Sequence, residues 1–199
     1  MKKMLVLALA MMTTLSVNAQ NGYDNTKHEV AVSYGYLTTS QVLDVFNMTL
    51  NIFTGYEPMK GSATGSISAE YFYNVNNWFG VGAIFSFGAF TMNYNMQIDN
   101  SPAYTTNNNC YTLLPAVKFN WLRREHFGMY SKLGAGVMLL DTKATPVDPN
   151  EKATRDQIIG FNFQASALGI EFGSAQFRGF IEGGFGEQGL AVVGLRYKF

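Results

Sequence analysis

The final stretch of the chain, Leu190–Phe199, reads L-A-V-V-G-L-R-Y-K-F. Its apolar and aromatic residues recur at every second position, namely at Ala191, Val193, Leu195, Tyr197 and Phe199. The intervening positions include Gly194, Arg196 and Lys198. Successive side chains of a β-strand point to opposite faces. The stretch therefore predicts a strand with one apolar face and one face of small and cationic residues.

The amino terminus has the order of features found in a secretory signal peptide. Lys2 and Lys3 precede an apolar run from Met4 to Met12, and Val17-Asn18-Ala19 fits a small-x-Ala cleavage site. We expect a signal peptide at residues 1–19 and a single mature domain at residues 20–199. A buried first helix is the weaker alternative. The residue directly after the cleavage site is Gln20 and not a cysteine, so we do not expect a lipid anchor.

Composition favours a protein that contacts lipid. Charged residues make up 14 % of the chain, against about 25 % in ordinary soluble domains, while aromatic residues make up 15 %. A soluble domain with so few charges would expose much apolar surface unless lipid covered it. The formal net charge is zero, which provides no basic field for nucleic acid. The only cysteine is Cys110, which we expect to be sheltered.

Alternation like that of the last strand recurs along the chain and predicts an all-β fold. Strands that cross the outer membrane contain about 9–11 residues and are joined by short periplasmic turns and longer outer loops. An even number of such strands places both termini in the periplasm. The predicted strands span residues 27–36, 64–75, 78–91, 110–121, 127–140, 159–172, 177–186 and 190–199. The predicted outer connections are long at 37–63, 92–109 and 141–158, and short at 186–189.

Three places depart from simple alternation. Gln41–Phe53 has apolar residues at helical spacing, which predicts a short helix in the first outer loop. Pro115 cannot donate a ladder hydrogen bond, so we expect a bulge there. Strict alternation along residues 159–172 would point Glu171 toward lipid, and a bulge near Gly169 or a position at the membrane edge would relieve this.

The polarity of the two faces predicts which one lies inside. The interior of an eight-stranded barrel is just wide enough to be filled by side chains, and small residues mixed with charges suit it. A soluble ligand-binding barrel would have the opposite arrangement. Buried charges must pair, so we expect Arg196 to contact Glu182 and Glu29, with Lys198 solvated at the periplasmic rim. The predicted lumen charge network comprises Glu29, Glu70, Lys118, Lys132, Glu182 and Arg196.

Catalytic and metal-binding patterns are weak in this sequence. A histidine is the usual general base of a lipid-modifying enzyme. His28 begins the first predicted strand and His126 lies in a predicted periplasmic turn, far from outer-leaflet lipid. The two histidines and the single cysteine do not form a metal-ligand pattern. We therefore expect no catalytic residues, no cofactor and no metal.

The signal peptide, the eight alternating strands and the terminal Phe199 together resemble the small OmpA/OmpX-type outer-membrane β-barrels, a group that includes porin-family proteins. The resemblance implies an eight-stranded up-and-down barrel, a monomer, that contacts outer-membrane lipid and lipopolysaccharide. It also implies that the barrel-assembly machinery reads Val193, Leu195, Tyr197 and Phe199. Structural or surface-interaction roles through the extracellular loops are typical of the family. A narrow channel or small-solute transporter is the alternative, and a lipid A-modifying enzyme is less favoured. The helical first loop departs from the smallest members.

Overall fold

A computed structural model describes residues 26–38, 56–96, 102–147 and 152–199. The predicted signal peptide and the predicted helix at Gln41–Phe53 lie outside these ranges. Among the described residues, no helix is long and apolar enough to cross a membrane.

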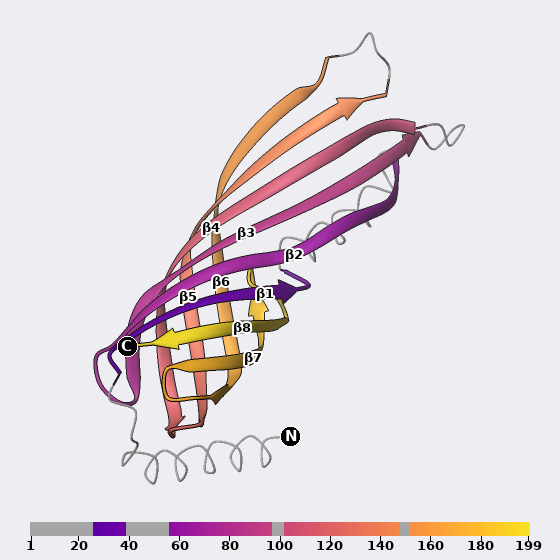
Figure 1. The fold of residues 1–199 in the computed structure, drawn as a ribbon. Coiled ribbons are helices and arrows are strands. Elements are labelled where there is room, and N and C mark those ends of the chain that lie inside the picture. The colour runs from indigo at the N-terminus through magenta and orange to yellow at the C-terminus, as the bar shows by residue number, and fades with distance from the viewer. Residues whose placement is uncertain (1–25, 39–55, 97–101, 148–151) are drawn as a thin grey trace, which may run out of the picture.

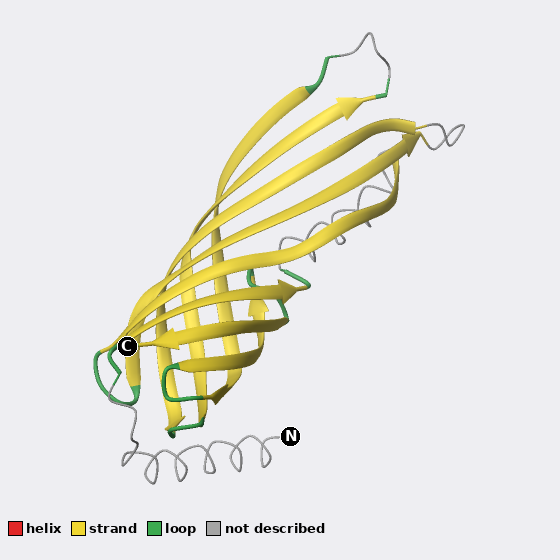
Figure 2. Ribbon diagram, in the orientation of Figure 1, coloured by secondary structure: helices red, strands yellow, loops and turns green. Residues whose placement is uncertain are grey.

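The described chain forms eight antiparallel strands in one closed sheet, as the alternation predicted (Figures 1 and 2). Each strand pairs with the next one along the chain, and the last pairs with the first. The topology is therefore an up-and-down barrel. In the closed ring every strand has a neighbouring strand on both sides. The strands are β1 His28–Tyr36, β2 Tyr56–Asn74, β3 Phe79–Met96, β4 Pro102–Arg123, β5 Phe127–Pro146, β6 Thr154–Gly173, β7 Phe177–Gly186 and β8 Ala191–Lys198.

The barrel closes where β8 meets β1. Ala31 lies opposite Arg196 in this register, and Glu29 lies opposite Lys198. The backbones of His28 and Phe199 exchange two N–H···O hydrogen bonds of 2.9 Å. The closing seam thus places an acidic residue beside a basic one and puts the start of β1 and the end of β8 at the same end of the barrel.

Strand length divides the sheet into a short and a long side. β1, β7 and β8 contain 9, 10 and 8 residues, whereas β2 to β6 contain 18 to 22. The five long strands project beyond the outer ends of the three short ones (Figure 1). We call this projecting part of β2–β6 the outer sheet. The predicted loops at 92–109 and 141–158 are therefore wrong over most of their length. In β6 the alternation is absent because both faces of the strand are solvent-exposed over residues 154–159, so neither face needs apolar residues.

The predicted bulge at Pro115 is also wrong. Pro115 pairs in continuous register with Ala83 of β3, and the β4–β5 register shift falls between Asn120 and Leu122. The proline is accommodated by Gly136 on β5, where an added Cβ would lie 3.1 Å from the proline Cδ and 2.2 Å from a backbone oxygen. Because Gly136 has no side chain, the ring of Pro115 fits beside it.

A bulge in β6 reverses the inside–outside alternation. The β6–β7 register shifts between Ser166 and Leu168, and the consecutive residues Ala167 and Leu168 are both exposed. An extra residue of this kind rotates the rest of a strand to the opposite face. Glu171 consequently points into the barrel and is 1 % exposed. The bulge lies just before Gly169, close to where the sequence predicted one.

Candidate functional site: the charge network in the barrel lumen

The part of the lumen near the chain termini is organised around Glu29 and Glu171. Lys118 Nζ donates to Glu29 Oε2 at 2.5 Å, and Asn74 Nδ2 donates to the other oxygen at 2.8 Å. Glu171 accepts hydrogen bonds from Arg178 Nη1 at 2.7 Å, from Arg196 Nη1 at 2.6 Å and from Lys198 Nζ. All of these side chains are buried. Each carboxylate is therefore satisfied by several charged or polar donors, as burial of an ion requires.

A second group of charges lies farther from the termini, around Lys132. Its Nζ donates to Glu70 Oε1 at 2.5 Å and to Glu182 Oε1 at 3.0 Å. Glu182 also accepts from Tyr130 Oη at 2.6 Å and from Ser166 Oγ at 2.7 Å. These residues come from β2, β5, β6 and β7. The group therefore ties strands together across the lumen that are not neighbours in the sheet.

Arg196 joins the two groups. Besides its bond to Glu171, its Nη2 donates to Tyr130 Oη at 3.1 Å and to Glu70 Oε2 at 3.4 Å. Its guanidinium carbon lies 4.6 Å from the centroids of both the Tyr130 and Phe180 rings. A planar guanidinium can bond in its plane and stack on aromatic faces at the same time. Arg196 uses both properties, so lysine could not replace all its contacts.

Arg178 closes the lumen at the turn end. Its guanidinium also donates to the backbone oxygens of Arg124 at 2.8 Å, Glu125 at 3.2 Å and Ser174 at 3.2 Å. These oxygens belong to two of the short turns. One arginine therefore fixes the turns to the charge network.

At the opposite end, the connection between β7 and β8 folds into the lumen. Glu187 and Gln188 are 1 % and 0 % exposed. Gln188 Nε2 donates to Glu70 Oε1 at 2.7 Å, and its backbone N–H donates to Gln164 Oε1 at 2.8 Å. Asn162 Nδ2 donates to Glu187 Oε2 at 2.9 Å. Gly186 and Gly189 flank this turn with φ of 145° and 118°, a conformation that glycine adopts at little cost. The sequence indicated only a tight connection here.

Apolar side chains also lie inside the barrel. Two buried clusters lie inside the barrel, one of Phe72, Ile84, Leu114 and Ala116 and one of Ala31, Phe180 and Val192. Cys110 is buried as expected, with its Sγ 3.7 Å from Thr112 Oγ1. The lumen therefore contains buried apolar clusters as well as ion pairs.

The six residues predicted for the lumen network are all buried inside the barrel, and the structure brings them into one connected set. The guanidinium nitrogens of Arg196 lie 3.9 Å from a carboxylate oxygen of Glu182 and 3.4 Å from one of Glu29, its two expected partners. They lie nearer to Glu171, at 2.6 Å. The predicted solvation of Lys198 is wrong, because its side chain turns inward to Glu171 and is fully buried. Sequence reasoning missed Glu171, Arg178, Tyr130 and Gln188 as members. The inward position of Arg178 does follow from the sequence, because alternation along residues 177–186 places this side chain on the inward face.

The outer face of the barrel is apolar. Outward residues of the closing strand are exposed, with Val193 at 55 %, Leu195 at 61 % and Phe199 at 52 %. Exposed apolar and aromatic side chains continue around the ring, among them Val32, Ile67, Phe85, Leu113, Leu133, Val137, Phe161 and Ile181. The ordinary arrangement of a soluble protein, with apolar residues inside and charges outside, is reversed.

The two histidines lie at the end of the barrel where β1 begins and β8 ends. His28 Nδ1 is 2.9 Å from Tyr71 Oη and its ring stacks on Phe199, and His126 Nδ1 is 3.0 Å from the Gly173 oxygen. Within the described parts of the chain, no cluster of three or more His, Cys, Asp or Glu could hold a metal ion.

Fold and site together define a closed eight-stranded barrel with an ionic interior and an apolar exterior. Similar solved structures include Ail, the attachment invasion locus protein of Yersinia pestis, alone and in complex with the heparin analogue sucrose octasulfate. The identities are 13 % and 16 %, the TM-scores 0.44 and 0.42, and each match covers 87 % of this chain and 99 % of the other. No family model and no curated protein matches the chain. The barrel assignment rests on the strand pairing of this chain itself.

Proposed function

We propose that this chain is an integral outer-membrane β-barrel with a plugged lumen, which acts through the surface segments it presents outside the membrane. The observation that carries the proposal is the reversed polarity of the barrel. Outward residues such as Val32, Leu195 and Phe161 are 60 %, 61 % and 72 % exposed, whereas Arg196 and Lys118 are buried. Outer-membrane barrels have an outward apolar band about 25 Å tall and a polar interior.

The direct test is fractionation of cells that express the full chain. We expect the protein in the outer-membrane fraction, with faster gel migration before heating than after it. A soluble periplasmic protein without this mobility shift would contradict the proposal and favour the soluble ligand-binding barrel.

The outer sheet is the segment best placed for a surface role. Residues 154–162 of β6 pair with β5 but not with β7, whose pairing begins at Gln164 and Gly186. An unpaired strand edge can bind an extended segment of a partner.

On the outward face of the same sheet, Arg155 Nε and Nη2 donate to the two oxygens of Asp141 at 2.7 and 2.6 Å. These hydrogen bonds hold the pKa of Asp141 below its ordinary value.

A barrel filled in this way should not conduct. Reconstituted in planar bilayers, the protein is expected to give no stable current steps across many insertions, because Arg196, Lys132 and the Glu187–Gln188 turn are buried inside the barrel, where we propose that they block the lumen. Insertion is checked on the same sample by heat-modifiable migration, and a conducting porin serves as positive control. Reproducible unitary currents would favour the alternative of a narrow channel.

The terminal residue provides a test of assembly. Deletion of Phe199 is expected to reduce the amount of folded barrel in the outer membrane severalfold, because we propose that Phe199 belongs to the assembly pattern and because it closes the seam through its two backbone bonds to His28. Deletion of Lys152, an exposed residue that precedes β6, controls for loss of length. Normal outer-membrane levels after removal of Phe199 would contradict the assembly role.

We further propose that the chain is not an enzyme. Both histidines lie beside the chain termini, and the proposed orientation places that end in the periplasm. A lipid A-modifying site would require a base near the outer leaflet.

A further inference from the structure

The free edge of the outer sheet presents main-chain hydrogen-bonding groups that face away from β5. Glu187 N–H donates to Phe163 O at 3.0 Å, so Phe163 directs its main-chain groups toward the β7 side of β6. In an antiparallel strand every second residue directs these groups to the same side, and the β5–β6 register has no shift in this stretch. Ile159 and Phe161 therefore direct their N–H and C=O groups to the free edge. Among the described residues, these groups have no hydrogen-bond partner.

Two polar side chains close the ends of this open stretch. Gln157 N–H donates to Asp156 Oδ1 at 2.9 Å, and Phe163 N–H donates to Asn162 Oδ1 at 2.8 Å. The N–H groups at both ends are thus satisfied by the residue that precedes them, whereas Ile159 and Phe161 keep donors and acceptors available. We call residues 155–161 the β6 edge.

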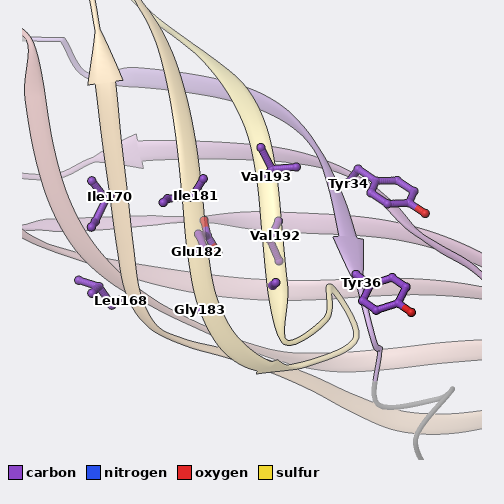
Figure 3. A pocket seen from close by; sticks show the side chains of 10 residues that line it. Tyr34, Tyr36, Leu168, Ile170, Ile181, Glu182, Gly183, Val192 and Val193 are labelled. Carbon is purple, nitrogen blue, oxygen red and sulfur yellow. The ribbon is translucent and has the colours of Figure 1, made fainter.

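The side chains of the β6 edge also lack cover. Ile159 and Phe161 are 78 % and 72 % exposed, the largest values among the exposed large apolar residues of the described chain. Where β7 covers β6, Leu168 and Ile170 stand beside Ile181 (Figure 3), and Leu168 is 38 % exposed. The β6 edge therefore lacks what a neighbouring strand supplies, namely main-chain partners and apolar cover.

The outward face beside the β6 edge is cationic at its Arg155 end. Arg155 lies opposite Lys143 of β5, which lies opposite Asn107 of β4. A hollow of about 320 Å³ lies over this row and is lined also by Asn109 and Asp141. Asp141 pairs with Arg155, while Lys143 is exposed and forms no ion pair with any described residue. Two cations and one anion give the hollow a net positive charge, which suits an anionic group.

We propose that the β6 edge binds an extended acidic peptide segment of another protein as an added antiparallel strand. This inference rests on the proposed function, which places the outer sheet outside the membrane. Ile159 and Phe161 bond to the main chain of the partner, and an acidic side chain of the partner lies beside Arg155 at the cationic hollow. In strand addition the main-chain hydrogen bonds supply affinity and the alternate side chains supply specificity.

The register of the sheet determines the sequence that such a partner needs. The outward side chains of an added strand stand opposite Arg155, Gln157, Ile159 and Phe161, because side chains alternate between the two faces. An antiparallel partner therefore has apolar residues opposite Phe161 and Ile159, and an acidic residue opposite Arg155, four positions after the second apolar one. A second copy of β6 does not fit, because the register that pairs Ile159 with its own copy would put Phe163 opposite Arg155.

The test measures peptide binding to the full-length mature protein in detergent micelles by fluorescence anisotropy. The probe is the labelled peptide T-V-T-V-T-S-T-E-T, and the control peptide has lysine in place of glutamate. We expect saturable binding of the glutamate peptide. Ile159→Pro should bind it ~10-fold more weakly, because the ring removes an N–H from the β6 edge and none from the β5 ladder.

Charge reversal tests the acidic preference separately. Arg155→Glu is expected to favour the lysine peptide over the glutamate peptide. Lys27→Glu makes the same change in net charge at an exposed position just before β1, and it should keep the preference of the unaltered protein. Heat-modifiable migration checks that each variant is folded.

Several results would overturn the inference. These are absence of peptide binding, equal binding by Ile159→Pro, and an unchanged preference in Arg155→Glu. A dimer of the unaltered protein that Ile159→Pro abolishes, without peptide binding, would assign the β6 edge to a second copy. If Ile159→Pro does not fold, a peptide N-methylated at its second valine removes the facing N–H instead, and equal binding of that peptide contradicts strand addition. Failure to fractionate with the outer membrane would contradict the proposed function, whereas peptide binding is measured on purified protein.

Discussion

Replacing Arg196 with alanine is expected to lower the free energy of unfolding of the barrel by about 3–5 kcal/mol, the usual effect of removing one partner from a buried ion pair. The reason is the number of groups that depend on this side chain. Glu171 loses a donor at 2.6 Å, Tyr130 loses one at 3.1 Å, and Glu70 loses one at 3.4 Å. All three remain buried, where an incompletely paired carboxylate is costly.

The measurement is a urea titration of the folded protein in detergent micelles, followed by intrinsic fluorescence and by gel mobility. Arg155→Ala is the matched control, because it removes an arginine–carboxylate pair from the exposed outer sheet, where such pairs contribute little. Arg196→Lys is expected to fall between the alanine variant and the unaltered protein, because an ammonium keeps the charge and loses the stacking on Tyr130 and Phe180. An unchanged urea midpoint for Arg196→Ala would show that the network does not stabilise the barrel, although the barrel itself would stand.

Replacing Glu171 with glutamine is expected to destabilise the barrel by a similar amount, about 3–5 kcal/mol. This isosteric change removes the negative charge that Arg178, Arg196 and Lys198 share. Three buried cations would then face one another with too little compensating charge. Glu125→Gln, in an exposed turn, is the control for loss of a carboxylate.

The pair of variants also tests whether the two residues act together. Residues in one network typically show coupling of about 0.5–3 kcal/mol, so the double variant Glu171→Gln/Arg196→Ala should be less destabilised than the sum of its single changes. Additive losses would indicate that Glu171 and Arg196 stabilise the barrel independently, which their 2.6 Å contact argues against.

The alternation in the sequence determined the number of strands and, for most residues, whether the side chain points into or out of the barrel. Side chains in a strand have a period of two, and a barrel wall between an apolar and a polar medium must follow that period. Glu29, Glu70 and Arg196 could therefore be placed inside from sequence alone. The same period placed Val193 and Leu195 outside. Where both sides of the sheet meet solvent, the period carries no information, and the outer sheet was missed for that reason.

Tertiary structure decided the features that break the period. The sequence allowed either a bulge near Gly169 or a membrane-edge position for Glu171, and only the structure selects the bulge at Ala167–Leu168, which turns the later residues of β6 to the opposite face. Lys198 is long enough to reach inward or outward, and only the position of Glu171 across the lumen selects the inward conformation. Gln188 enters the lumen because its turn folds back over Glu70. The sequence by itself determined which strands form and which faces are apolar, because those depend on local periodicity. The pairing of charges across the lumen depends on distances between strands far apart in the chain, which only the closed barrel sets.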